Sequence, residues 1–112
     1  MKSILLVDDS HDNHVLYQII LANYKLVSAT NGADALTELE SNQFDLIITD
    51  MSMPGMDGVQ FIDACLERGI ETPIVLSSAN HEAMHPQALN LPKPFNIKDL
   101  YSVVAKLTNE AA

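Results

Sequence analysis

Four short runs of consecutive apolar residues alternate with segments of helical periodicity, and this alternation limits the possible folds more than any other feature of the sequence. The runs predict strands over Ser3–Val7, Lys25–Ala29, Asp45–Thr49 and Pro73–Ser77. Because apolar residues occupy consecutive positions in them, we expect strands that are buried on both faces. Strands that alternate with helices connect through right-handed crossovers and form a parallel sheet.

The segments between the strands carry apolar residues at helical spacing. Helical patterns follow Asp12 and Asn31, and a third, which Asp57 can cap from just before its start, ends at Gly69. A fourth follows Asn96, a residue type that favours the N-cap position. The first and last patterns consist of Val15, Leu16, Ile19 and Ile20, and of Ile97, Leu100, Val104 and Leu107. With a fifth strand over Leu89–Leu91, the sequence predicts a flavodoxin-like, doubly wound (βα)5 sandwich, an α/β fold with a five-stranded parallel sheet, in one domain over residues 1–112.

The segment between Ser78 and Lys93 departs from a regular alternation. It is about two helical turns shorter than a full helix and its loops require. Pro86 interrupts any helix that begins there, and apolar residues are sparse. We therefore predict that the fourth of the five expected helices is truncated or missing.

Composition excludes several functional classes. The chain has 112 residues with 6 Lys and Arg against 15 Asp and Glu, a formal net charge of −9. Such a charge argues against direct nucleic-acid binding, which depends on basic side chains. No apolar run approaches the ~20 residues that cross a membrane, and no signal peptide is evident. The single Cys65 suits a reducing compartment, so a cytoplasmic location is expected.

Acidic residues follow the predicted strands where a parallel sheet binds its ligands. Asp8 and Asp9 come directly after the first apolar run, Asp50 after the third, and Lys93 after the fifth. Ligands of open α/β sheets bind beyond the carboxyl ends of the strands. Three carboxylates at one place repel one another unless a cation joins them, and Mg²⁺ is the natural cation for oxygen ligands.

Four sequence blocks resemble the receiver domain of two-component response regulators. They are residues 4–9 (ILLVDD), residues 50–58 (DMSMPGMDG), Ser78-Ala79 and residues 93–95 (KPF), in the order found in that family. The resemblance covers nearly the whole chain and suggests the stand-alone, single-domain type. It implies a signalling phosphoacceptor and not an enzyme in the usual sense.

The resemblance implies a role for each site residue. Asp50 is the expected phosphoacceptor, and the expected metal ligands for Mg²⁺ are Asp8 through water, Asp9, Asp50 and the backbone carbonyl of Ser52. Ser78, Ala79 and Lys93 are the expected phosphoryl-binding and switch residues. The implied partners are a histidine kinase or histidine phosphotransfer protein as donor, and an unidentified protein that receives the signal.

Two features near the fifth strand bear on how a signal leaves the domain. The family commonly carries an aromatic residue three positions before the lysine, and Asn90 stands there in this chain. We expect the signal to leave through a remodelled face around residues 79–92 or through another surface. The family also suggests a cis peptide bond between Lys93 and Pro94.

Three other interpretations remain open from the sequence. The shortened segment and Asn90 suit a pseudo-receiver that acts as a phosphorylation-independent scaffold. An Mg²⁺-dependent phosphatase also uses an aspartate nucleophile, but its usual acid would stand at Ser52, which cannot serve as one. His81, Glu82 and His85 match the zinc-protease pattern HExxH, although Pro86 disfavours the helix that such a site needs.

We expect the histidines outside the acceptor-site blocks to lie on the surface. His81 and His85 are expected to be surface loop residues. His11 and His14 are expected to be exposed on the first helix, with modulation of access to Asp50 as the alternative.

Overall fold

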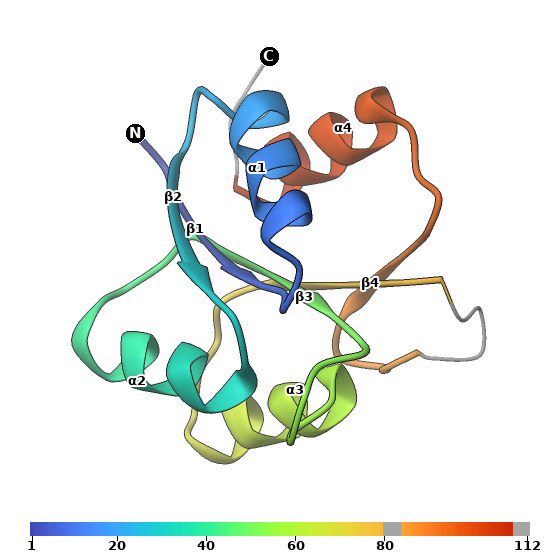
Figure 1. The fold of residues 1–112 in the computed structure, drawn as a ribbon. Coiled ribbons are helices and arrows are strands. Elements are labelled where there is room, and N and C mark those ends of the chain that lie inside the picture. The colour runs from blue at the N-terminus through green and yellow to red at the C-terminus, as the bar shows by residue number, and fades with distance from the viewer. Residues whose placement is uncertain (80–83, 109–112) are drawn as a thin grey trace.

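The computed structural model describes residues 1–79 and 84–108, which contain five strands and four helices (Figure 1). The strands are β1 (Ser3–Val7), β2 (Lys25–Ala29), β3 (Leu46–Asp50), β4 (Ile74–Ser78) and β5 (Leu89–Pro92). The helices are α1 (His11–Ile20), α2 (Gly32–Ser41), α3 (Gly58–Glu67) and α4 (Ile97–Leu107). The third and fourth strands lie one residue later than predicted, so Asp50 and Ser78 end strands instead of following them.

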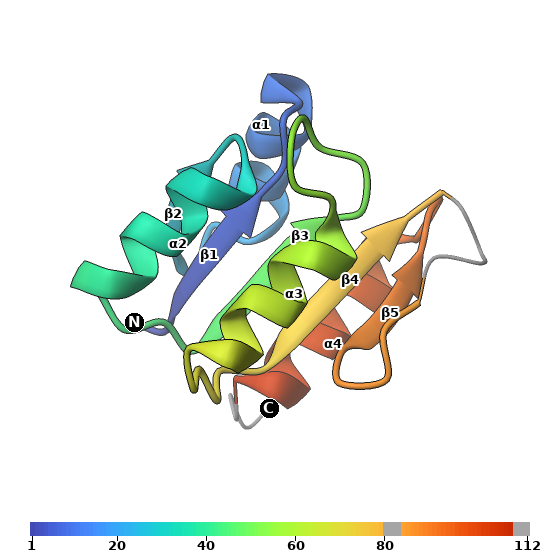
Figure 2. The same ribbon diagram turned by 90° about the horizontal axis from the view of Figure 1, so that it is seen from below.

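All five strands pair in parallel in the order β2-β1-β3-β4-β5. Helices α2 and α3 cover one face of the sheet, and α1 and α4 cover the other (Figures 1 and 2). Each face has its own buried apolar cluster, which is why the strands carry consecutive apolar residues. The structure confirms the predicted flavodoxin-like α/β fold.

Side-chain caps begin the four helices. Ser10, Asn31, Asp57 and Asn96 each accept a hydrogen bond from a backbone N–H of the first helical turn. The caps of α3 and α4 were predicted from the sequence, and that of α3 includes a reciprocal bond in which the Asp57 N–H donates to the Gln60 side chain. These local signals fix where each helix leaves the carboxyl edge of the sheet.

No helix lies between β4 and β5 among the described residues 79 and 84–88, in agreement with the prediction that this helix is truncated or missing. A hydrogen-bond network around His85 holds this connection. Asn90 Oδ1 accepts a hydrogen bond from the His85 N–H at 3.2 Å, and Asn90 Nδ2 donates one to the His85 carbonyl at 3.3 Å. The Gln87 N–H donates to His85 Nδ1. His85 Nε2 therefore carries the proton and donates to Asp63 on α3, at 2.8 Å.

The HExxH match lies mostly outside the described residues, which lack His81 and Glu82. The expectation that His85 is a surface residue is wrong, because only 6% of it is exposed. Its ring takes part in a hydrogen-bond network that joins the β4–β5 connection to α3, and this network explains its burial without a metal.

Helix α1 packs through a different face from the one that its apolar residues suggest. His14 and Tyr17 are buried, whereas Leu16 and Ile19 are exposed, Ile19 by 70%. The prediction that His14 is exposed is therefore wrong, and the prediction for His11 is confirmed. His14 shares the helix face of Tyr17, which points to the sheet, and its ring has a polar partner in the loop after β1.

Candidate functional site

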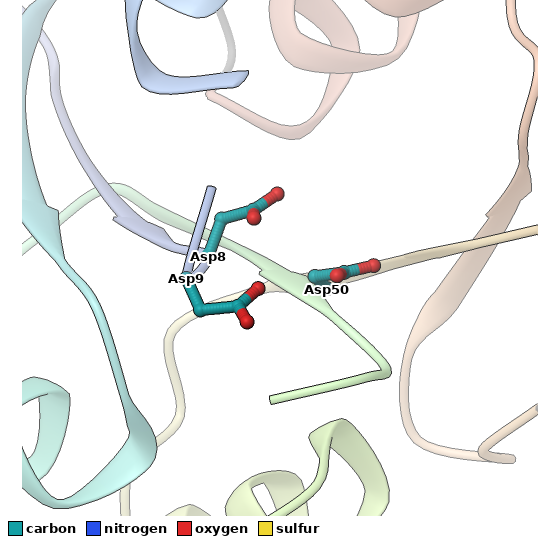
Figure 3. A group of neighbouring side chains, drawn as sticks. All are labelled: Asp8, Asp9 and Asp50. Carbon is teal, nitrogen blue, oxygen red and sulfur yellow. The ribbon is translucent and has the colours of Figure 1, made fainter. Parts of the chain in front are cut away.

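The carboxyl ends of β1 and β3 bring three acidic residues together (Figure 3). Asp8 and Asp9 lie in the loop after β1, and Asp50 is the last residue of β3. One carboxylate oxygen from each of the three lies within 4.8 Å of the others. This distance approaches the ~4 Å that separates opposite ligands of an octahedral Mg²⁺ ion. The residues that the sequence placed at this edge are therefore neighbours in the fold.

The Asp8 side chain is buried, and each of its oxygens accepts a hydrogen bond. Its Oδ1 accepts a hydrogen bond from the Ser10 N–H at 2.9 Å, and its Oδ2 accepts one from Asn13 Nδ2 at 3.0 Å. The Asp8 N–H donates to the Ala29 carbonyl of β2 at 3.0 Å. Each carboxylate oxygen of Asp8 therefore accepts one hydrogen bond from the protein and keeps a lone pair that faces the rest of the cluster.

Lys93 joins the cluster from the loop after β5. Its Nζ lies 3.1 Å from Asp50 Oδ1 and 3.9 Å from Asp8 Oδ2. Partial burial raises the pKa of Asp50 above its ordinary value, although the charge and hydrogen bond of Lys93 oppose that rise. The negative charge of Asp8 adds to it. A cation at this site would, like Lys93, favour the ionised form of the Asp50 carboxylate.

The other predicted site residues surround this cluster at the same edge of the sheet. Ser52 is exposed in the loop between β3 and α3. Ser78 is buried at the end of β4, and its carbonyl accepts the Lys93 N–H at 2.8 Å. Ala79 follows it and is exposed. The peptide bond between Lys93 and Pro94 is cis, as the resemblance suggests.

Asn90 does not reach the acidic cluster. It pairs with Leu76 across the strands, and its amide bonds the backbone of His85 and Ala88 in the β4–β5 connection. The position that the family commonly gives to an aromatic residue is therefore occupied here by a side chain that fixes a loop.

Sequence reasoning missed two residues that support the site, Asn13 and the buried His14. Asn13 binds the Asp8 carboxylate, and His14 Nε2 lies 2.6 Å from the Asp8 carbonyl oxygen. Both stand in the first turns of α1, directly after the acidic pair. Polar residues in that position are a usable signal, because a helix that starts there must point its first turns at the preceding loop.

An apolar cavity of about 430 Å³ opens beside Lys93. Leu16 and Tyr17 of α1 line one side, and Phe95 lines the other, with its ring 6.4 Å from that of Tyr17. Burial, and secondarily the charge of Asp8, raises the pKa of Tyr17 well above its usual value, so its hydroxyl stays neutral. The charged cluster therefore borders a surface that can receive apolar side chains.

Donor chemistry fits a hard divalent cation. The cluster offers carboxylate oxygens, with neither thiolate nor imidazole among its three members. Within the described part of the chain, no helix combines the length and apolar character needed to cross a membrane.

Sequence comparison finds similarity to response regulators and to parts of sensor histidine kinases. The response regulator receiver domain family matches residues 4–105. The response regulator receiver protein CpdR of Brucella abortus (strain 2308) is 32% identical, with coverage of 96% of this chain and 97% of CpdR. The sensor histidine kinase GacS of Pseudomonas protegens is 34% identical, over 96% of this chain but only 13% of the kinase.

Solved structures share the fold. The response regulator TrrA of Thermotoga maritima, in complex with Mg²⁺ and BeF, has a TM-score of 0.88 at 31% identity, over 96% of this chain and 99% of TrrA. The receiver domain of the Francisella response regulator 1452 has a TM-score of 0.91 at 24% identity, over 98% of each chain, and supports the fold alone.

Proposed function

This chain belongs to the response regulator receiver family, and from that membership we propose that it accepts a phosphoryl group on Asp50 and signals through the resulting conformational change. The donor would be a histidine kinase or a histidine phosphotransfer protein, in the cytoplasm. The observation that carries the proposal is the cluster of Asp8, Asp9 and Asp50, with Lys93 bonded to Asp50. We further propose that residues 1–112 act as one domain.

Asp50 is suited to act as the nucleophile. It stands at the end of a central strand, and 14% of its side chain is exposed, so a donor can reach it while the backbone holds it in place. A carboxylate oxygen attacks the phosphorus, the bond from phosphorus to the donor breaks, and an acyl phosphate forms on Asp50.

Mg²⁺ would be held by Asp9 and Asp50 directly, by Asp8 through water and by the Ser52 carbonyl. When bound, the ion neutralises charge on the phosphoryl oxygens. The exposure of Asp9 and the two hydrogen bonds that the buried Asp8 carboxylate already accepts support this division of roles. The TrrA structure, which contains Mg²⁺ and BeF, supports the choice of metal by similarity.

Lys93, Ser78 and Ala79 would bind the new phosphoryl group. Lys93 already lies 3.1 Å from Asp50 Oδ1, so its ammonium can pair with a phosphoryl oxygen after a small movement. The Ser78 hydroxyl and the Ala79 N–H would donate hydrogen bonds from the end of β4. A dianion on Asp50 would thereby pull on the start of the β4–β5 connection.

The signal would leave through the remodelled face around residues 79–92 or another surface. Asn90 supports this view because its amide is engaged in holding the connection and does not point into the site. The His85 bond to Asp63 also links the connection to α3. A movement of Ser78 and Ala79 would then be transmitted to α3 and not to an aromatic switch.

The decisive experiment is intact-protein mass spectrometry after incubation with acetyl phosphate, with and without Mg²⁺. We expect one added phosphoryl group that requires Mg²⁺ and is absent in Asp50→Asn. Glu67→Gln is the matched control, since it makes the same carboxylate-to-amide change at an exposed position at the end of α3. Failure to add a phosphoryl group with either acetyl phosphate or a phosphorylated histidine donor would favour the phosphorylation-independent scaffold.

A further inference from the structure

The ring of His14 is bonded to the backbone of the acidic pair. Its Nε2 lies 2.6 Å from the Asp8 carbonyl oxygen, and only 5% of the residue is exposed. A carbonyl oxygen only accepts hydrogen bonds, so Nε2 must carry the proton and donate. Nδ1 of the same ring is buried and has no hydrogen-bond partner in the described part of the chain.

The accepting carbonyl belongs to the peptide bond that joins Asp8 to Asp9. Because a peptide unit is planar, holding its carbonyl oxygen also sets the orientation of the Asp9 nitrogen and, through it, the start of the Asp9 side chain. Asp8 has further anchors in Ser10, Asn13 and Ala29. The Asp9 carboxylate makes no hydrogen bond or ion pair with the described residues, so its direction depends on the backbone.

The unpartnered Nδ1 argues against a role in packing alone. A leucine would fill a buried position on this face of α1 without leaving a polar atom unsatisfied, which is unfavourable. What a leucine cannot supply is the donor at the position of Nε2.

We propose that His14 is a positioning residue for the metal site: its Nε2–H orients the peptide between Asp8 and Asp9 so that the Asp9 carboxylate faces Asp50 and can bind Mg²⁺. The proposal rests on the proposed function, because it assumes that Asp9 is a direct ligand. It adds a residue outside the acidic cluster whose loss should weaken metal binding without removing any carboxylate.

Two substitutions separate donation from packing. In His14→Gln the amide nitrogen stands about where Nε2 was, whereas in His14→Asn the amide is one bond shorter and falls short of the carbonyl. His11→Gln, on the exposed face of the same helix, is the control for the substitution itself. The readouts are Mg²⁺ affinity from amide chemical shifts in a MgCl2 titration, and thermal stability without metal.

We expect His14→Asn to bind Mg²⁺ about 10-fold more weakly than the wild type, and His14→Gln to stay within about 3-fold of it, as for other residues that orient metal ligands. Equal affinity in all three proteins, or equal weakening in both variants, would overturn the proposal. A wild type that does not bind Mg²⁺ would instead contradict the proposed function.

A measurement on the wild type needs no variant. Long-range ¹H–¹⁵N correlation spectra distinguish the two neutral tautomers of histidine. We expect a proton on His14 Nε2, and a ring that carries its proton on Nδ1 with none on Nε2 would overturn the proposal even if the variants do not fold.

Discussion

Replacing Gly58 by alanine should strain the junction between β3 and α3 beside the acceptor site. Gly58 is the first residue of α3, and an added Cβ would lie 2.5 Å from the Asp50 carbonyl oxygen and 2.9 Å from the Met51 Cα. Both atoms belong to the backbone and cannot rotate away. It would also lie 2.8 Å from Cδ1 of Leu76 in β4. The substitution therefore forces the end of β3 and the start of α3 apart.

The added methyl group should destabilise the fold by about 1–3 kcal/mol, the usual cost of overpacking. The higher helix propensity of alanine offsets less than about 1 kcal/mol of that cost. For a domain of this size that corresponds to a melting temperature lower by about 5–15 °C. Urea unfolding followed by circular dichroism measures the free-energy difference directly.

Gly32→Ala is the matched control for this prediction. Gly32 is likewise the first residue of a helix, but the atom nearest to an added Cβ is the Met56 Sδ at 2.7 Å, at the end of a flexible side chain. We expect Gly32→Ala to change stability by less than about 1 kcal/mol, since methionine can rotate away. A Gly58→Ala variant that is no less stable than Gly32→Ala would show that the backbone of Asp50 and Met51 can accommodate a Cβ at position 58.

Three further predictions concern the acceptor, the β4–β5 connection and the core. Because the folded-state pKa of Asp50 is raised, its ionisation opposes folding. We therefore expect the free energy of unfolding of Asp50→Asn, minus that of the wild type, to rise as the pH increases from the unfolded-state pKa of Asp50 to its folded-state pKa, and to stay level above it. Urea unfolding in EDTA at a series of pH values measures this difference, and a difference that falls with pH would refute the reasoning. Asn90→Ala removes three hydrogen bonds to the connection and should cost about 1.5–3 kcal/mol, with faster amide exchange at His85, Gln87 and Ala88; unchanged exchange there would contradict the network. Burial raises the pKa of Cys65 to about 11, so its thiol should react with a disulfide reagent at neutral pH only at the rate at which the protein opens, and a rate equal to that of a free thiol would disprove the burial.

Much of the fold follows from patterns that are local in the sequence. Consecutive apolar residues predict the strands, and Asp57 and Asn96 predict two of the helix starts. The edge where Asp8, Asp9 and Asp50 gather follows as well, because the carboxyl ends of parallel strands share one side of the sheet. The family resemblance added the expected roles of these residues, which phosphorylation experiments must test.

Contacts across elements escaped the sequence analysis. The apolar residues Leu16 and Ile19 suggested one face of α1, but the sheet buries the face that carries His14 and Tyr17. Nothing local distinguishes the two faces, since both repeat at helical spacing and the choice depends on how α1 lies on β1. Burial of His85 was missed for the same reason, because its partners lie on α3 and β5.

By itself, the sequence determined the order of strands and helices, two of the four helix caps, the truncation or loss of one helix, and the edge of the sheet where the acidic residues gather. Each of these depends on backbone preferences within a few residues or on the shared direction of parallel strands. Only the tertiary structure decided that His14 holds the acidic pair, that Asn90 holds a loop, and that Gly58 must lack a side chain. Those features arise where segments distant in the chain come within contact distance, and packing at that distance depends on the whole fold.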